Sequence, residues 1–299
     1  MQDDERPASG GFFLGKKRRP HLEKPSLLWY NRTSKGSLMM ERKALFFDYD
    51  GTIISGGKMP QEIPALFDQL KERGHLLFLN TGRTRAILDP RCKALPFDGY
   101  ILGCGSAVEL GGETLYEYAL PMERCAEIAE QLRALGVQGF LEGMDTLYYT
   151  RRFVNLGFRA CRAQYKRIGV NVKPVSELNS PFTKMYLRFP SQKRLTRFQE
   201  NWGTEFDFIK REELCWELVP AGHTKATGIR LVMERLNLRV ENCYAFGDGN
   251  NDRPMLELVP NSALIGAGNA ELRKIVRYVS SGVHKGGLAE AVRALGLLD

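Results

Sequence analysis

Residues 44–52 read ALFFDYDGT, and this stretch decides the fold. The four leading apolar residues are typical of a parallel strand that is buried on both faces. Asp48 and Asp50 follow at its end, and ligands of open α/β sheets bind at the carboxyl ends of strands. Since residues i and i+2 of an extended segment point to the same side, we expect both carboxylates to face one reaction centre, while Gly51 lets the chain turn away. One carboxylate can then attack and the other can move a proton.

The segments on either side of this stretch repeat a strand and helix pattern. Apolar residues at helical spacing predict a helix over 63–70, and residues 76–79 are interpreted as a second buried strand. Late in the chain the same reasoning predicts helices over 225–236, 270–278 and 286–296 and strands over 243–246 and 263–265. Strand, helix and strand in this order require a parallel sheet covered by helices. We therefore predict an α/β protein with a doubly wound, Rossmann-like core over 43–108 and 206–299.

The middle of the chain has a different pattern. Polar and apolar residues alternate over 147–150 and 183–189, which predicts exposed antiparallel strands, and helices are expected over 122–135 and 153–167. Residues 109–205 are therefore interpreted as an inserted α+β domain.

Composition limits the remaining possibilities. The chain has 299 residues and a net charge of +8, of which residues 1–43 carry +5. Residues 1–42 show no sustained period and are interpreted as a basic tail whose run at 16–19 is solvated, so nucleic acid is not expected as a partner. No stretch approaches the roughly 20 apolar residues of a membrane-spanning helix, and no secretory signal is recognised, so a cytoplasmic protein is expected. The six cysteines and four histidines are scattered, which argues against zinc.

A second acidic group follows another predicted strand. Residues 246–252 read FGDGNND, with Pro254 suited to a helix start. Carboxylates that converge on one cleft repel each other unless a cation neutralises them, and a ligand set made only of oxygens selects Mg²⁺. Mg²⁺ would also hold a phosphoryl group for in-line attack.

Donors for a phosphate are expected at two further places. Residues 80–83 read NTGR at the end of the second strand, where a helix is expected to open, so the Thr81 hydroxyl and backbone N–H groups near Gly82 are candidates for phosphate binding. Lys225 precedes the second acidic group, and its ammonium would offset charge on the transferred group.

The order of these motifs resembles the haloacid dehalogenase superfamily, specifically its Cof-type phosphatases of subclass IIB. The features that carry the resemblance are DxDGT after the first strand, a strand-end Thr-Gly-Arg, a lysine and then GDGxND. The resemblance covers about residues 43–299. It implies a phosphoric monoester hydrolase, with residues 109–205 as a C2-type cap that closes over the site and selects the substrate.

The resemblance also assigns roles to individual residues. It makes Asp48 the nucleophile that forms an aspartyl-phosphate and Asp50 the general acid and base. It implies that the side chains of Asp48 and Asp248 and the backbone carbonyl of Asp50 hold Mg²⁺, while Asp252 orients the metal shell. Phosphate contacts are implied for Thr81, Lys225 and Asn251. One departure is GCGS at 103–106, where many relatives show Asn-Gly, so the substrate contact usually ascribed to that asparagine is not expected.

The sequence thus predicts a Mg²⁺-dependent phosphatase of a small organic phosphate, such as a sugar phosphate, a nucleotide or a cofactor phosphate. Two alternatives stay open. A phosphomutase with the same core would return the phosphoryl group to another hydroxyl, and a non-catalytic anion-binding protein would keep only the sheet. His223, in the expected connection between cap and core, is interpreted as a solvated linker histidine.

Overall fold

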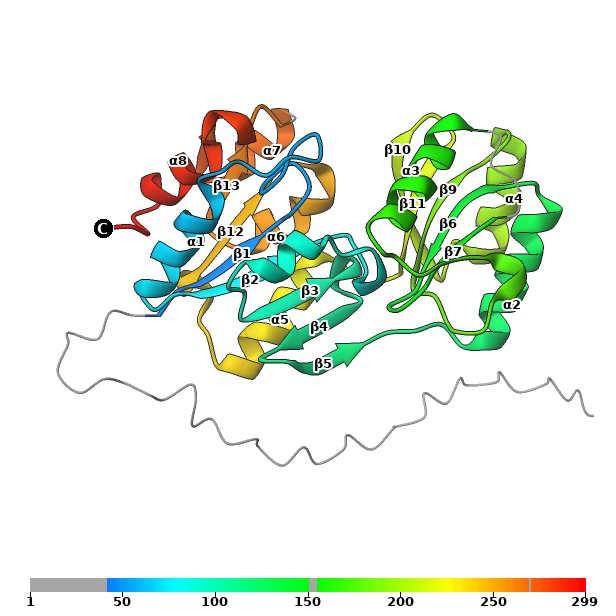
Figure 1. Cartoon of the computed structure of the whole chain (residues 1–299), viewed down its shortest axis with the longest axis horizontal. Coiled ribbons are helices and arrows are strands. Elements are labelled where there is room, and N and C mark those ends of the chain that lie inside the picture. The colour runs from blue at the N-terminus through cyan, green and yellow to red at the C-terminus, as the bar shows by residue number, and fades with distance from the viewer. Residues whose placement is uncertain (1–41, 151–154, 269) are drawn as a thin grey trace, which may run out of the picture. The chain divides into compact units, whose positions relative to one another are not determined.

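The computed structural model describes residues 42–150, 155–268 and 270–299. Apart from Arg42, the basic tail expected over 1–42 lies outside these residues, as does the start of the helix expected over 153–167. The described residues form two sheets, one of eight strands and one of six (Figure 1). None of the described helices is both long and apolar enough to span a bilayer.

The larger sheet is the predicted core. Its strand order is β14-β13-β12-β1-β2-β3-β4-β5. The bounds are β1 Ala44–Phe47, β2 Leu76–Asn80, β3 Gly99–Leu102, β4 Ala107–Leu110, β5 Glu113–Glu117, β12 Cys243–Gly247, β13 Asn261–Ile265 and β14 Tyr278–Ser280. All neighbours from β14 to β3 are parallel, and β4 and β5 are antiparallel additions. Because Phe47 is paired with Phe246 and Leu79, strands β1, β2 and β12 end at one edge.

Helices cover both faces of this sheet, as a buried parallel sheet requires. They are α1 Ile63–Glu72, α5 Lys225–Leu236, α6 Arg253–Leu258, α7 Ala270–Ile275 and α8 Gly287–Ala294. Alternate residues of β1 show how one face is filled: Leu45 and Phe47 pack in one cluster with apolar residues of α1 and α8. The Phe47 ring lies 4.8 Å from the ring of Phe67 in α1. The helices expected over 63–70 and 225–236 are confirmed.

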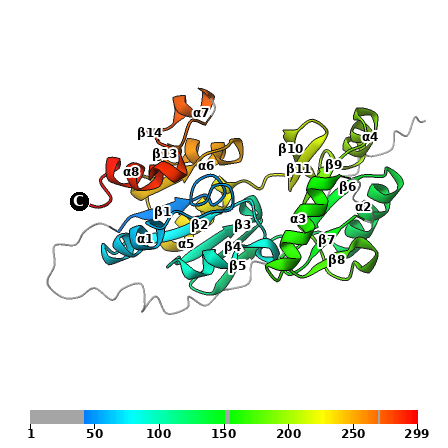
Figure 2. The same cartoon turned by 45° about the horizontal axis from the view of Figure 1, so that its top comes forward.

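The smaller sheet has the order β10-β11-β9-β6-β7-β8. Its strands are β6 Gln138–Glu142, β7 Leu147–Tyr149, β8 Val172–Pro174, β9 Lys184–Arg188, β10 Phe206–Glu212 and β11 Cys215–Pro220. All neighbours are antiparallel except β7 and β8. Helices α2 Met122–Ala134 and α4 Gln192–Trp202 pack on one face, and α3 Leu156–Arg167 packs on the other (Figure 2).

One expectation about this region was wrong. The strands expected to be exposed, β7 and β9, are largely buried because helices cover both faces of their sheet. The two sheets do not divide at the expected boundaries 109 and 205, since β4 and β5 belong to the larger sheet and β10 and β11 to the smaller one. Sequence alternation marks a strand but does not say with which sheet it pairs. We propose that the cap domain spans about residues 118–222.

The two connections between the sheets touch each other. Tyr116 and Tyr118 stand where the chain leaves β5, and His223 stands where it returns toward α5. His223 Nε2 lies 2.7 Å from the Tyr116 hydroxyl, and its ring lies 4.9 Å from the ring of Tyr118. His223 is therefore a bonded and partly buried residue, not the solvated histidine that we expected.

Candidate active site

A cavity of about 290 Å³ lies at the edge where β1, β2 and β12 end. Both sheets contribute to its wall. It is lined by Asp48, Asp50, Thr81, Gly82, Arg83, Ile87, Glu142, Lys184, Arg211, Glu217, Asp248, Gly249 and Asn251. The loops that follow the three strands therefore meet in one place, as the sequence predicted, and the smaller sheet supplies the remaining side chains.

Three carboxylates meet at this edge. Oxygens of Asp48, Asp248 and Asp252 all lie within 4.8 Å of one another, so this cluster could hold a metal ion. Asp252 already accepts hydrogen bonds from the backbone N–H groups of Asp248 at 2.8 Å and Gly249 at 2.9 Å. It therefore shapes the loop that presents Asp248, which fits the orienting role expected for it.

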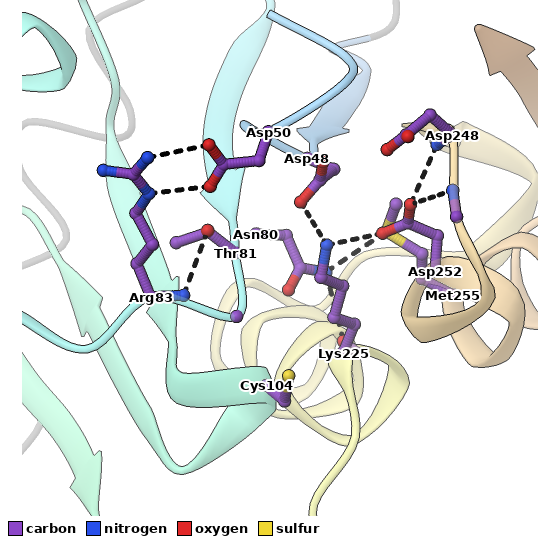
Figure 3. A network of polar contacts seen from close by, with 12 residues as sticks. Asp48, Asp50, Asn80, Thr81, Arg83, Cys104, Lys225, Asp248, Asp252 and Met255 are labelled. Atoms are coloured by element: carbon purple, nitrogen blue, oxygen red, sulfur yellow. Dashed lines mark hydrogen bonds and ion pairs between the residues drawn. The ribbon is translucent and has the colours of Figure 1, made fainter. Parts of the chain in front are cut away.

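Lys225 lies between the carboxylates (Figure 3). It is the first residue of α5, whose start is fixed by a capping box between Thr224 and Thr227. Its side chain is completely buried, and Nζ donates to Oδ1 of Asp48 and Oδ1 of Asp252. The sequence placed this ammonium against a phosphate, whereas the structure gives two of its three donors to carboxylates.

The ionisation of the cluster is shifted by burial and by the mutual repulsion of its charges. Burial raises the pKa of Asp48 well above its ordinary value, and the charges of Asp252 and Asp248 raise it further while Lys225 opposes them. Burial and the charge of Asp252 raise the pKa of Asp248 to about 6. Burial disfavours the charged form of Lys225, but the two carboxylates outweigh it and raise its pKa. The site therefore gains from a further positive charge.

Asp50 lies in the same cavity but outside the three-carboxylate cluster. Its carboxylate accepts two parallel hydrogen bonds from Arg83, with Nε and Nη2 each 2.7 Å from an oxygen (Figure 3). About half of the Asp50 side chain is exposed. The bidentate pair was not predicted, although Arg83 belongs to the NTGR stretch that drew attention to Thr81.

Three of the four expected phosphate-binding residues, Thr81, Gly82 and Asn251, line the cavity, whereas the buried Lys225 is not in its lining. Thr81 is buried, and its hydroxyl accepts a hydrogen bond from the Arg83 N–H at 3.2 Å. The Thr81 N–H donates to Ile101 within the sheet, so it is not a phosphate donor. No α-helix opens at residues 80–83; a loop leads to a 3₁₀ turn at Arg85–Ile87 because Thr81 continues the pairing of β2 with β3. Asn251 and Gly82 lie at the cavity wall.

Four charged side chains of the smaller sheet were missed by sequence reasoning. They are Glu142, Lys184, Arg211 and Glu217. Lys184 Nζ donates to Glu217 and to the Gly82 carbonyl of the larger sheet at 2.7 Å. Burial disfavours the charged form of Glu217, but Lys184 and Arg211 lower its pKa to about 2. Sequence reasoning had no signal for them, because a charged residue in an alternating strand is ordinary when one face of the strand is expected to be solvated.

Cys104, at the departure from the Asn-Gly pattern, also reaches the site. It has a left-handed conformation with φ of 57°, between two glycines that are also left-handed. Its thiol lies 3.9 Å from Glu217 Oε1, and burial raises its pKa to about 12. The thiol is therefore protonated, so it offers a weak donor where an amide was expected in relatives.

Sequence comparisons agree with this geometry. The family profile of haloacid dehalogenase-like hydrolases matches residues 45–292. YkrA of Bacillus subtilis (strain 168), provisionally named a phosphatase, is 29% identical over 270 residues that cover 87% of this chain and 100% of that protein. The HMP-PP phosphatase of Escherichia coli O8 (strain IAI1) is 27% identical over 241 residues, which cover 76% of this chain and 85% of that protein.

Solved structures share the fold. A hypothetical protein from Geobacillus kaustophilus HTA426 has a TM-score of 0.75 and 26% identity, covering 86% of this chain and 100% of its own. A HAD subclass IIB sugar phosphatase has a TM-score of 0.72 and 23% identity, covering 85% and 99%. The second likeness concerns the fold alone. The profile match, which includes the strands that carry Asp48, Thr81 and Asp248, shows that the chain belongs to the haloacid dehalogenase-like hydrolase family.

Proposed function

We propose that this chain is a Mg²⁺-dependent phosphatase that hydrolyses a small organic phosphate monoester through an aspartyl-phosphate on Asp48. One observation carries the proposal: Asp48 is buried at the end of a parallel strand, held by Lys225 and grouped with Asp248 at the base of a cavity. The names of YkrA and the HMP-PP phosphatase support the same reaction class.

The residues present fit a divalent cation. Five carboxylates and three cationic side chains line the cavity, so a dianionic phosphate would meet net repulsion without another positive charge. The candidate ligands are hard carboxylate and carbonyl oxygens, which favour Mg²⁺ over softer metals. We propose Asp48 and Asp248 as side-chain ligands, with the backbone carbonyl of Asp50 as the third. When bound, Mg²⁺ would neutralise charge on the phosphoryl oxygens.

Asp48 provides the nucleophile in the first step. A carboxylate oxygen of Asp48 attacks phosphorus in line with the leaving oxygen; the new P–O bond forms as the ester P–O bond breaks. Lys225 positions the Asp48 carboxylate through its hydrogen bond and offsets charge on the transferred group. Thr81 and Asn251 provide hydrogen-bond donors at the cavity wall for phosphoryl oxygens.

Asp50 moves the protons. In its protonated form it donates to the leaving alcohol, and its carboxylate then takes a proton from the water that attacks the aspartyl-phosphate and releases Asp48. The ion pair with Arg83 must open for this exchange. Since about half of the Asp50 side chain is exposed, water can hydrate its carboxylate when the pair opens.

Phosphate release from phenyl phosphate tests the proposal. Activity should disappear with EDTA and return with Mg²⁺, and Asp48→Asn should lower kcat by about a thousandfold or more while the thermal midpoint is retained. Asp68→Asn, a matched change on the exposed side of α1, should leave the rate unchanged. Near-normal turnover by a folded Asp48→Asn variant would remove Asp48 from its role.

A further inference from the structure

Strand alternation in the smaller sheet divides its active-site face into two zones. Glu142 of β6 is paired with Lys184 of β9, and Phe140 is paired with Tyr186 two residues along. Residues two apart on a strand share a face, so the charged pair and the aromatic pair lie side by side on one surface. The charged zone borders the phosphate cavity, and the aromatic zone continues away from it.

The hydrogen bonds in the charged zone leave one group unsatisfied. Both carboxylate oxygens of Glu217 accept hydrogen bonds, Oε1 from Lys184 and Oε2 from Arg211. Glu142 is 5% exposed, and its Oε2 has no hydrogen-bond partner among the residues that the structure describes; Lys184 Nζ lies 3.5 Å away. A buried carboxylate oxygen without a donor costs free energy that a ligand can recover.

A second cavity of about 390 Å³ begins at the same residue. Glu142 lines both cavities, and the second is walled by the rings of Phe140, Phe158, Tyr165 and Tyr186, with the polar side chains of Asn155, Arg188 and Glu212 also in its lining. These rings lie 5.5 to 5.8 Å from their neighbours, an ordinary spacing for packed aromatic pairs. A compound bound at Asp48 that extends past Glu142 therefore enters an aromatic enclosure.

We propose that the organic group of the substrate is a planar ring carrying a hydroxyl or amino group, which donates a hydrogen bond to Glu142 Oε2 while the ring lies in the aromatic cavity. This inference rests on the proposed phosphatase activity. Glu142 is then a specificity-determining residue, because it contacts the leaving group and not the phosphorus. A flexible polyol has no flat face that could pack against these rings.

Four phosphate esters of primary alcohols test the contribution of a ring and that of a hydrogen-bond donor separately, because their leaving groups are chemically similar. They are propyl phosphate with neither, glycerol 1-phosphate with donors only, benzyl phosphate with a ring only, and 3-hydroxybenzyl phosphate with both; 3-aminobenzyl phosphate distinguishes an amine from a hydroxyl. We expect kcat/KM of the substituted benzyl phosphates to exceed that of benzyl phosphate by about tenfold to a hundredfold, as a hydrogen bond to a charged group provides. Benzyl phosphate should in turn exceed propyl phosphate.

Variants of Glu142 and Tyr186 test which residue causes the preference for the ring substituent and which causes the preference for the ring. The ratio of kcat/KM for 3-hydroxybenzyl phosphate to that for benzyl phosphate should fall in Glu142→Gln, whose amide oxygen is a weaker acceptor, and should fall close to one in Glu142→Ala, whereas Tyr186→Leu should reduce the preference for a ring. Glu130→Gln, on the exposed side of α2, is the matched control.

Three results would overturn the inference. Glycerol 1-phosphate could match the substituted benzyl phosphates, the Glu142 variants could slow benzyl phosphate as much as its hydroxylated form, or Tyr186→Leu could keep the full ring preference. A wild-type protein that releases phosphate from no compound in the panel, nor from phenyl phosphate with Mg²⁺, would instead disprove the proposed phosphatase activity and the inference with it.

Discussion

At the scale of single residues, Gly51 connects the two halves of the acidic site. It has φ of +96°, and a Cβ at this position would lie 2.1 Å from Asp248 Oδ2. Two requirements therefore meet at one residue: a left-handed turn after Asp50, and space for a carboxylate from a strand almost 200 positions later. The glycine of the DxDGT motif is therefore needed for two reasons: it allows the turn, and it leaves room for the Asp248 carboxylate.

Gly51→Ala should damage metal binding more than stability. The methyl group would displace the Asp248 carboxylate, so the Mg²⁺ concentration for half-maximal activity should rise at least tenfold, by analogy with lost support for a metal ligand. A Mg²⁺ titration of phosphate release measures this. Gly57→Ala is the matched control, because Gly57 also has positive φ but a Cβ there meets no atom within 4 Å. An equal effect in both variants would attribute the loss to backbone strain instead.

The sequence predicted where the candidate reacting residues lie better than it predicted which side chains contact them. Asp48 and Asp248 could be placed together because parallel strands end at one edge, a rule that needs no side-chain detail. The burial of Lys225 between two carboxylates and the pairing of Asp50 with Arg83 depend on rotamers and on contacts distant in sequence. The roles assigned to these residues stay predictions for kinetics to test.

At the scale of elements, a buried histidine marks the start of β2. His75 is 3% exposed, its Nε2 lies 3.3 Å from the Leu297 carbonyl, and its Nδ1 has no hydrogen-bond partner within residues 42–150, 155–268 and 270–299. Burial lowers its pKa below the usual value of 6.5. The folded protein therefore favours the neutral form of the His75 imidazole.

This histidine should make stability fall in mild acid. Below about pH 6.5 the unfolded chain binds a proton that folded His75 resists, so the free energy of unfolding decreases as the pH falls, until the folded pKa is reached. The slope from this group is at most about 1.4 kcal/mol per pH unit. Urea unfolding from pH 7 to 5 should show a shallower loss in His75→Gln than in the wild type. His284→Gln, the same substitution at an exposed site, is the matched control; parallel curves for the wild type and His75→Gln would refute the assignment.

The hydrophobic period of the sequence identified helices and strands, but it did not show which strands pair with each other. Four apolar residues in a row gave β1, β2 and β12, and helical spacing gave α5 at its observed bounds. Strands β10 and β11 were assigned to the core because they come after the insert, yet they pair with β9. Pairing depends on tertiary contacts that alternation alone does not specify.

At the scale of the whole described chain, the apolar residue Ile87 packs across the two sheets. It lies in the 3₁₀ turn after β2 and is buried in a cluster with Phe140 and Leu147 of the smaller sheet and Phe158 of α3. Together with the Lys184 bond to the Gly82 carbonyl, this contact holds the charged side chains of the cap against the cavity.

Ile87→Ala should weaken this closure. Removing its buried carbon atoms lowers the free energy of unfolding by about 2–5 kcal/mol at a typical core site. Because Ile87 packs on the cap, we expect most of this loss to weaken the docking of the cap. We expect KM for benzyl phosphate to rise about threefold to tenfold with a smaller change in kcat. Ile63→Ala in α1, equally buried but distant from the cap cluster, should lower the thermal midpoint and leave KM unchanged. The same KM in both variants would show that Ile87 does not govern closure.

The contact between Tyr116 and His223 also has an evolutionary consequence. Because the chain leaves the larger sheet and returns to it at touching points, everything between them is a cassette with adjacent ends. A recombination event that exchanged the gene segment between these points would replace Glu142, Lys184 and the aromatic enclosure together. Asp48 and Asp248, carried by strands outside the cassette, would keep their places. The reaction can thus be inherited while the compound on which it acts is replaced.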